Sequence, residues 1–134
     1  KIQRDSSFVL KNQKKNIKHN IDRLDNLKNL VDEFHKNISK KKLNFRILGK
    51  IVDQSWKIKK NFSNKVTNNL INHLYNMVKN CGSDGAKIIG AGAGGFLMVF
   101  ANNKTQKKII SNLEKNELLK INCEYKGSQI IYED

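Results

Sequence analysis

A glycine-rich loop is the feature that most restricts how this chain can fold. Four glycines occupy six consecutive positions, residues 90–95, with the sequence Gly-Ala-Gly-Ala-Gly-Gly. Short apolar runs flank the loop at residues 86–89 and 96–101, and runs of this length favour strands over helices. Because glycine adopts positive φ angles with little strain, the loop predicts a tight connection between two consecutive antiparallel strands.

The same loop bears on binding. Exposed successive amides in such a loop can hold an anion, and no side chain keeps a ligand or another backbone away. The loop is not a Walker A motif, because Lys87 precedes the glycines instead of following them. Nor is it a dinucleotide fingerprint, because a strand-like run follows Gly95 where that fingerprint needs a helix. A purely structural turn is the alternative to a phosphate-binding loop.

Helical periodicity dominates the chain before the loop. Apolar residues recur every three or four positions over residues 6–36, and we expect a bend or break around residues 12–16. Three lysines at residues 40–42 predict a linker, and a second helix is expected from residue 43 until it fades at the basic stretch 57–60. The expected inward-facing residues of this second helix are Leu43, Ile47, Leu48, Ile51, Val52 and Trp56.

Further elements are expected on both sides of the glycine loop. A third helix is predicted over residues 68–80, with Thr67 or Asn68 as its cap, Gly82 as its terminating residue, and Leu70, Leu74, Met77 and Val78 facing inward. After the loop, the pattern predicts a helix over residues 104–117. Alternating apolar residues at 119–125 and a turn before residues 129–132 then predict a β-hairpin.

The order of these elements indicates the fold class. Helices come first, followed by strand, loop, strand, helix and a final pair of strands. Because short loops join consecutive strands, we expect an α+β fold with an antiparallel β-sheet covered on one face by helices. The length of 134 residues fits a single domain, residues 1–134.

The high positive charge of the chain indicates which kinds of binding partner are compatible with it. The formal net charge is +14, which is compatible with nucleic acid, an anionic membrane surface or a phosphorylated ligand. Lysine is spread along the whole chain, so a surface of solvated lysines is the alternative. The absence of a long apolar run predicts no membrane span, and two cysteines favour a reducing, cytoplasmic setting over a disulfide framework. No metal ligands are assigned, because the three histidines lack ligand spacing.

A resemblance to a known family rests on the loop and its flanks. Residues 85–96 resemble the third conserved motif of the GHMP kinases, commonly written Gly-Ala-Lys-x-x-Gly-Ala-Gly-x-Gly-Gly. Ala93 stands where glycine is frequent. Other segments are similar to the branch that phosphorylates heptose phosphates, the D-glycero-D-manno-heptose 7-phosphate kinases; they are residues 4–7, 48–49, 56–60, 63–68 and 125–132.

This resemblance implies a GHMP kinase C-terminal domain with a ferredoxin-like arrangement. It also implies a sugar or sugar-phosphate kinase that uses ATP and Mg²⁺, bound mainly by a separate N-terminal domain. That domain, absent from this chain, would be its partner and would carry the phosphate loop and the catalytic acid. We therefore assign no catalytic residue here and expect the isolated chain to be inactive. The alternative within the family is a kinase of another small molecule, such as a galactokinase or a mevalonate kinase.

The resemblance also implies which residues form the site. The loop residues would be a wall of the active site whose amides support the substrate or the phosphate loop; they are Gly90, Ala91, Gly92, Gly94 and Gly95. Lys57, Lys60 and Lys87 are candidates for contacts with a substrate phosphate, since lysine binds phosphate as a point charge. The alternative for Lys57 and Lys60 is that they are solvated and favourably placed at a helix C-terminus.

A non-catalytic nucleic-acid-binding module is the alternative from a different class. A basic α+β domain could bind RNA on its sheet, where exposed strand aromatics stack on bases. The predicted strands offer Phe96, Phe100, Tyr125 and Tyr132 without the required RNP pattern. Nucleic acid is therefore not expected as a partner.

Overall fold

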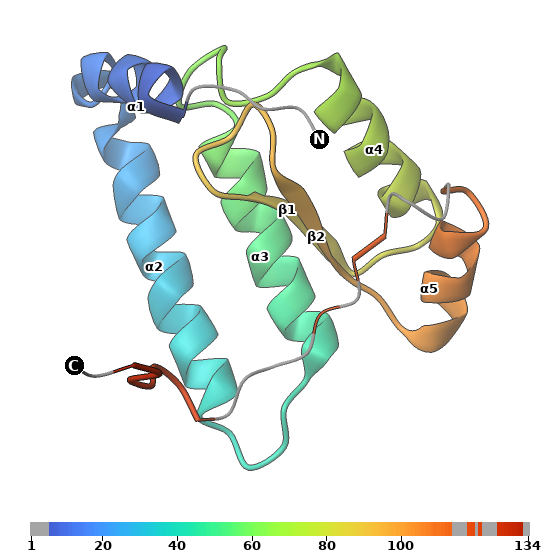
Figure 1. Cartoon of the computed structure of the whole chain (residues 1–134). Coiled ribbons are helices and arrows are strands. Elements are labelled where there is room, and N and C mark those ends of the chain that lie inside the picture. The colour runs from blue at the N-terminus through green and yellow to red at the C-terminus, as the bar shows by residue number, and fades with distance from the viewer. Residues whose placement is uncertain (1–5, 114–117, 120, 122–125, 133–134) are drawn as a thin grey trace.

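The computed structural model describes residues 6–113, 118–119, 121 and 126–132. Its helices and strands follow one another as an α+β fold, in agreement with the sequence, and Figure 1 shows the helices gathered around a short sheet. The elements are α1 (Ser6–Lys15), a 3-10 helix η1 (Lys18–Asn20), α2 (Ile21–Ile38), α3 (Phe45–Lys59), α4 (Asn69–Asn80), β1 (Gly85–Ile89), β2 (Phe96–Phe100) and α5 (Asn103–Ile110).

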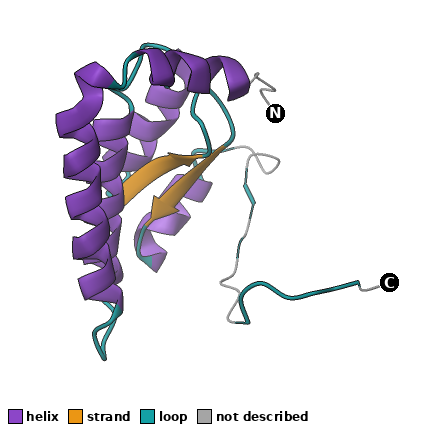
Figure 2. Cartoon of the chain, turned by 90° about the vertical axis from the view of Figure 1, so that its left-hand side faces the viewer, coloured by secondary structure: helices purple, strands orange, loops and turns teal. Residues whose placement is uncertain are grey.

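The sheet of the described residues consists of β1 and β2. The strands are antiparallel, and their register pairs Gly85 with Phe100 at one end and Ile89 with Phe96 at the other. The glycine loop closes the second end. The predicted strand-loop-strand unit is therefore confirmed. Figure 2 shows this pair of strands beside a layer of helices.

Asparagine side chains begin three of the helices. Asn68 accepts a hydrogen bond from the Ile71 amide at 2.9 Å, which confirms the predicted cap of α4. Asn44 and Asn102 do the same for α3 and α5. Each such cap satisfies a backbone donor that has no partner within its own helix, and its replacement by alanine typically costs about 1 kcal/mol.

The first long helical pattern is broken, as expected, although a few residues later. The break lies between the end of α1 and the start of α2, where η1 intervenes. Asn20 sits at this junction, only 3% exposed, and its side-chain amide donates to the Phe62 carbonyl at 3.0 Å. The break is therefore held by a contact with the segment that follows α3. Local sequence periodicity cannot reveal a contact between residues so far apart.

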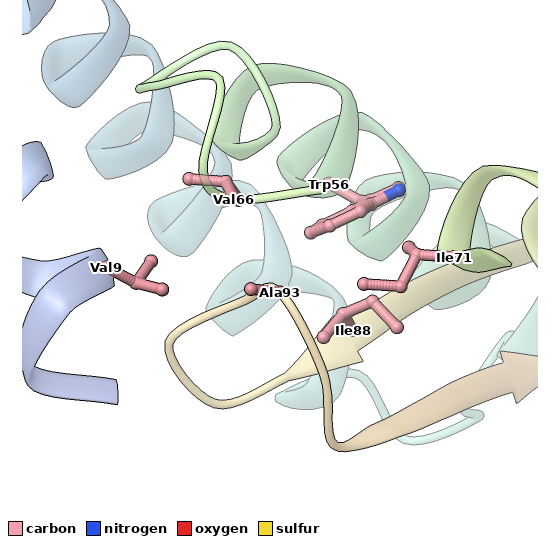
Figure 3. Packing of buried hydrophobic residues seen from close by; sticks show 6 residues of the cluster. All are labelled: Val9, Trp56, Val66, Ile71, Ile88 and Ala93. Atoms are coloured by element: carbon pink, nitrogen blue, oxygen red, sulfur yellow. The ribbon is translucent and has the colours of Figure 1, made fainter. Parts of the chain in front are cut away.

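Two clusters of buried side chains form the core. The larger one joins α1, α3, α4, β1 and the glycine loop (Figure 3); its buried members are Val9, Trp56, Val66, Ile71, Ile88 and Ala93. Trp56 is 1% exposed, so truncating it to alanine would cost about 3–5 kcal/mol. The smaller cluster joins α4, β1 and α5 through Val78, Ala86 and Ile109.

Helix α3 touches strand β1 backbone to backbone. A Cβ added to Gly85 would lie 1.8 Å from the carbonyl oxygen of Gly49 on α3. A Cβ added to Gly49 would in turn lie 2.7 Å from the Cβ of Phe100. Both distances are too short for real atoms, so the packing of α3 on the sheet requires glycine at these two positions.

Helix α3 ends at Lys59, within the basic stretch 57–60 where it was expected to fade. Other expectations about the helices were wrong. Leu43 and Leu70 are 45% and 49% exposed rather than inward-facing, and Ile71 takes the buried position on α4. Helix α5 ends at Ile110, short of the predicted end; residues 114–117 lie outside the described part.

The predicted C-terminal hairpin is also not observed where it can be judged. Residues 126–132 contain no strand, and Ile131 is 96% exposed. Most of the other predicted strand, residues 122–125, lies outside the described residues. An isolated two-stranded hairpin is only marginally stable in water unless one of its faces is buried. The alternation of apolar and polar residues does not by itself provide a surface that buries this face.

Candidate functional site

The glycine loop between β1 and β2 has the backbone geometry that its sequence predicts. Gly90, Gly92 and Gly95 have φ angles of 97°, 112° and 101°. Ala93 also has a positive φ, 62°, which is uncommon for a residue with a side chain. The loop is therefore a tight turn built from left-handed residues.

The segment after α3 packs directly against this loop. The Ala93 amide donates to the Val66 carbonyl at 2.7 Å, and a Cβ added to Gly92 would lie 2.7 Å from the same oxygen. The methyl group of Ala93 is 2% exposed and belongs to the larger core cluster (Figure 3). The departure from the family pattern at Ala93 thus adds a core contact and leaves the turn intact.

Side chains from three elements hold the loop through its carbonyl groups. Gln13 of α1 donates to the Ala91 carbonyl at 3.1 Å, and Asn68, the cap of α4, donates to that of Ala93 at 3.1 Å. Lys59, the last residue of α3, donates its ammonium to the Gly90 carbonyl. The loop is therefore fixed by long-range hydrogen bonds and does not depend on its glycines alone.

Fewer amide groups than carbonyl groups of the loop form hydrogen bonds within the described residues. Within the described residues, the Ala93 amide donates to the Val66 carbonyl, which lies outside the strands. The amides of Ala91, Gly92 and Gly94 donate to no acceptor in that part of the chain. Successive amides of this kind can donate to the oxygens of an anion.

Two lysines lie near this loop: Lys59, which contacts the Gly90 carbonyl, and Lys87, whose charge acts on Lys59. Burial lowers the pKa of Lys59, and the nearby charge of Lys87 lowers it further. Burial also lowers the pKa of Lys87. Neither lysine forms an ion pair with a carboxylate of the described residues. An anion bound between them would relieve both the desolvation and the mutual repulsion of the two ammonium groups.

A second polar cluster lies further along α3, around Asp53. The Asp53 side chain is 6% exposed and pairs with Lys57 at 2.9 Å and with Lys79 at 3.4 Å. It also accepts hydrogen bonds from the Tyr75 hydroxyl at 2.9 Å and from the Ala86 amide at 3.2 Å. Its oxygens are therefore occupied, and this cluster joins α3 to α4 and β1.

The pKa values in this cluster follow from its contacts. Burial alone would raise the pKa of Asp53, but the hydrogen bonds from Lys57, Tyr75 and Ala86, with the charge of Lys79, lower it overall. Burial raises the pKa of the Tyr75 hydroxyl, and its hydrogen bond to Asp53 raises it further. Asp53 is thus held as a carboxylate by its partners, which makes it a structural group.

The three lysines proposed from the sequence lie in three different places. Lys87 is beside the glycine loop and Lys59, whereas Lys57 is bound to Asp53. Lys60 lines a separate hollow with His19 and Arg23. Whether any of them binds phosphate stays a prediction, as does the role of the loop residues themselves.

Sequence reasoning did not single out Asp53, and it considered Lys59 only as one member of the basic cluster at residues 56–60. The pairing of Asp53 with Lys57 has a recognisable signal, because residues four apart lie on the same face of a helix. Lys59 follows the buried Trp56 by three residues, so both face the same side of α3. Its contact with Gly90 depends on how α3 packs against the sheet, which local spacing does not encode.

The described residues also bear on metal binding and on membranes. Among the described residues, no group of three histidine, cysteine, aspartate or glutamate side chains is arranged to hold a metal ion. Within the same ranges, no helix combines the length and the apolar composition that crossing a bilayer requires.

Comparison with known proteins gives two matches. The family model described as GHMP kinases C terminal matches residues 21–118, which is more than half of the chain. The chain is also 33% identical over 73 residues to a protein named D-glycero-alpha-D-manno-heptose 7-phosphate kinase, from Campylobacter jejuni. That match covers 54% of this chain and 22% of the relative, so the chain aligns with less than a quarter of that protein. The chain belongs to the family of GHMP kinase C-terminal domains.

Proposed function

We propose that this chain is the C-terminal domain of an ATP-dependent kinase that phosphorylates a sugar or a sugar phosphate. The observation that carries the proposal is the contact of Lys59 with the Gly90 carbonyl of the glycine loop, with Lys87 nearby and no carboxylate partner for either lysine among the described residues. The amides of the loop and the two ammonium groups together offer a set of donors for phosphate oxygens.

Such a set of donors suits phosphoryl transfer. Negative charge is spread over the oxygens of the transferred group, and the protein accelerates the step mainly by positioning and electrostatic stabilisation. In the proposal, Gly90, Ala91, Gly92, Gly94 and Gly95 form one wall of the site. Lys59 and Lys87 add positive charge to it. The fixed carbonyls of the loop keep its amides in place, so the donors need little rearrangement when the phosphate enters.

ATP and Mg²⁺ are the cofactors that the proposal requires. The described residues fit the phosphate groups of the nucleotide, because they provide amide and ammonium donors. They do not provide a cluster of metal ligands. We therefore place the metal and the catalytic acid in an N-terminal domain of the whole protein, which is the proposed partner of this chain, in the cytoplasm.

The proposed acceptor is a sugar phosphate similar to that of the Campylobacter relative. Its name specifies a heptose 7-phosphate, and the match over 73 residues includes part of the present domain. Another small molecule with a hydroxyl group is the alternative. Assays of the whole protein that contains this chain, with ATP and a panel of heptose, hexose and other acceptors with and without phosphate, distinguish these cases.

Variants test whether this domain contributes to the reaction. Lys59→Gln and Lys87→Gln should each lower kcat/KM by about tenfold to a hundredfold, because each removes a charged donor from the phosphate. Lys50→Gln, which removes an exposed charge from the same helix, is the matched control and should have little effect. Full activity of the Lys59→Gln/Lys87→Gln double variant, or no ATP-dependent transfer to any acceptor by the whole protein, would contradict the proposal.

A further inference from the structure

A hollow lies where the segment after α3 meets the junction of α1 with α2. Its volume is about 430 Å³, which is within the range of small-ligand sites. Three basic side chains line it from three elements: His19 of η1, Arg23 of α2 and Lys60, which follows α3. Its other lining residues are neutral, so no carboxylate within the lining offsets the charges of Arg23 and Lys60.

Partly buried hydrogen bonds hold the elements around the hollow together. The Phe62 carbonyl accepts from the side-chain amides of Asn20 at 3.0 Å and Asn16 at 3.4 Å. Asn20, 3% exposed, also accepts from Arg23 at 2.6 Å, which orients the guanidinium through one of its nitrogens. The turn after α3 and the junction of α1 with α2 are thus held together, and a cation from each borders the space between them.

Donors remain for a ligand in this hollow. Arg23 has five N–H groups, and its bonds to Asn20 and to the His19 carbonyl both use the same nitrogen, Nη1. The Ser63 oxygen accepts from the Lys65 amide at 3.2 Å, so its hydroxyl hydrogen is available to donate. Lys60 forms no ion pair with a carboxylate of the described chain. An arginine fork, an ammonium and a hydroxyl match the several oxygens of a phosphate group.

We propose that this hollow binds the phosphate monoester of a small molecule, through Arg23 and Lys60. Lys59 and Lys60 are consecutive, so their Cα atoms are about 3.8 Å apart, yet Lys59 contacts the glycine loop and Lys60 lines the hollow. The phosphate has two sources. It is the phosphate already present on the acceptor, which rests on the proposed function, or it belongs to a separate molecule.

Direct binding tests the hollow without any assumption about catalysis. In an NMR titration of the whole protein without nucleotide, inorganic phosphate and glucose 6-phosphate should shift the amides of residues 19–23 and 60–64, and glucose should not. Arg23→Gln/Lys60→Gln should weaken this binding by at least about tenfold. Lys28→Gln/Lys36→Gln removes two exposed charges from α2 outside the hollow and should leave the affinity within about twofold.

The glycine loop must be separated from the hollow in the same titration. Lys59→Gln/Lys87→Gln should leave the shifts at residues 19–23 in place. The proposal is overturned if those amides do not shift, if the Arg23/Lys60 variant binds as tightly as the natural protein, or if the control variant is weakened equally, which would mean that only net charge matters.

Kinetics then identify the source of the phosphate. If the acceptor supplies it, the Arg23/Lys60 variant should raise KM for a phosphorylated acceptor at least about tenfold, with little change for ATP. If that KM is unchanged while direct binding is lost, the hollow serves a separate phosphate-bearing molecule. Direct binding without any kinase activity would still support the hollow and would contradict the proposed function alone.

Discussion

Lys57 and Lys59 lie two residues apart near the end of α3, and their surroundings differ. Lys57 pairs with Asp53, which also binds Lys79, Tyr75 and the backbone of β1. Lys59 contacts a carbonyl of the glycine loop and is close to a second lysine. In the first cluster each lysine is paired with the Asp53 carboxylate, whereas the two lysines of the second have no carboxylate partner among the described residues. Charge that the fold does not neutralise is what a ligand can use.

The largest expected effect is on the Asp53 cluster. Asp53→Ala should lower the free energy of unfolding by about 3 kcal/mol or more, because it leaves Lys79, Tyr75 and the Ala86 amide without their acceptor. Denaturant unfolding of the purified protein measures the change. Lys57→Gln is the control and should cost less than about 1 kcal/mol, since the Lys57 side chain is 58% exposed. Equal losses of unfolding free energy for the two variants would mean that buried Asp53 is no more important for stability than exposed Lys57.

Substitutions in the glycine loop should cause the next largest loss of stability. Gly92→Ala should destabilise the protein by about 2–3 kcal/mol, because the new Cβ would lie 2.7 Å from the Val66 carbonyl in addition to the strained φ of 112°. Gly90→Ala has a similar φ of 97° but meets nothing within 4 Å, so it isolates the strain. It should cost about 1 kcal/mol. Thermal unfolding of both variants gives the comparison, and equal costs would show that contact with Val66 is unimportant.

Acid should weaken the Asp53 cluster specifically. The pKa of Asp53 is lower in the folded protein than in the unfolded chain, so the unfolded chain binds the proton first as pH falls. Its contribution to stability is present above about pH 4 and is lost as pH falls through the lower folded-state pKa. Unfolding curves between pH 6 and pH 2 test this against Asp53→Asn, which should show a shallower acid loss. Parallel curves would exclude Asp53 as a source of the acid sensitivity.

Ala93→Gly should have a smaller effect. The change relieves a positive φ of 62° but removes a buried methyl group and increases the freedom of the unfolded chain. These contributions oppose one another, and we expect a net loss below about 1 kcal/mol by denaturant unfolding. A clear stabilisation would mean that backbone strain outweighs the core contact.

Removing the charges of Lys59 and Lys87 should have the smallest effect on stability. Lys59→Gln/Lys87→Gln should change the free energy of unfolding by less than about 0.5 kcal/mol, because the lost hydrogen bond is offset by relief of desolvation and repulsion. Lys79→Gln, measured beside it, should cost more, since it takes a partner from buried Asp53. If the double variant proves the less stable of the two, the lysines at the loop are structural after all.

The sequence was sufficient where local chemistry decides the structure. Glycines at residues 90–95 and the apolar runs beside them fixed the strand-loop-strand unit, and Asn68 was recognisable as a cap. The inward placement of Leu43 and Leu70 was wrong, because it depends on which face of a helix meets the rest of the protein. The last predicted strand, residues 129–132, is exposed and contains no strand, because its apolar residues have no face to pack against.

The candidate site could also be predicted only where local sequence determines it. The loop itself could be located from its glycines, and Lys87 from its place in the motif. Successive residues of a helix point about 100° apart, so Lys57, Lys59 and Lys60 face different surroundings although they are neighbours in the sequence. Assigning them to Asp53, to the loop and to the hollow required the packing of α3 on β1 and beside α2.

The contact of Gly49 with Gly85 has a consequence for how tightly an anion can bind. With no side chain between them, α3 and β1 are held at a fixed separation, and Lys59 and Gly90 lie at the ends of these two elements. The charged donor and the loop are therefore in register before any ligand arrives. Binding of the proposed phosphate would then lose less conformational entropy than if two independent segments had to be ordered, so the proposed affinity at the loop would depend on two glycines in the interior of the domain.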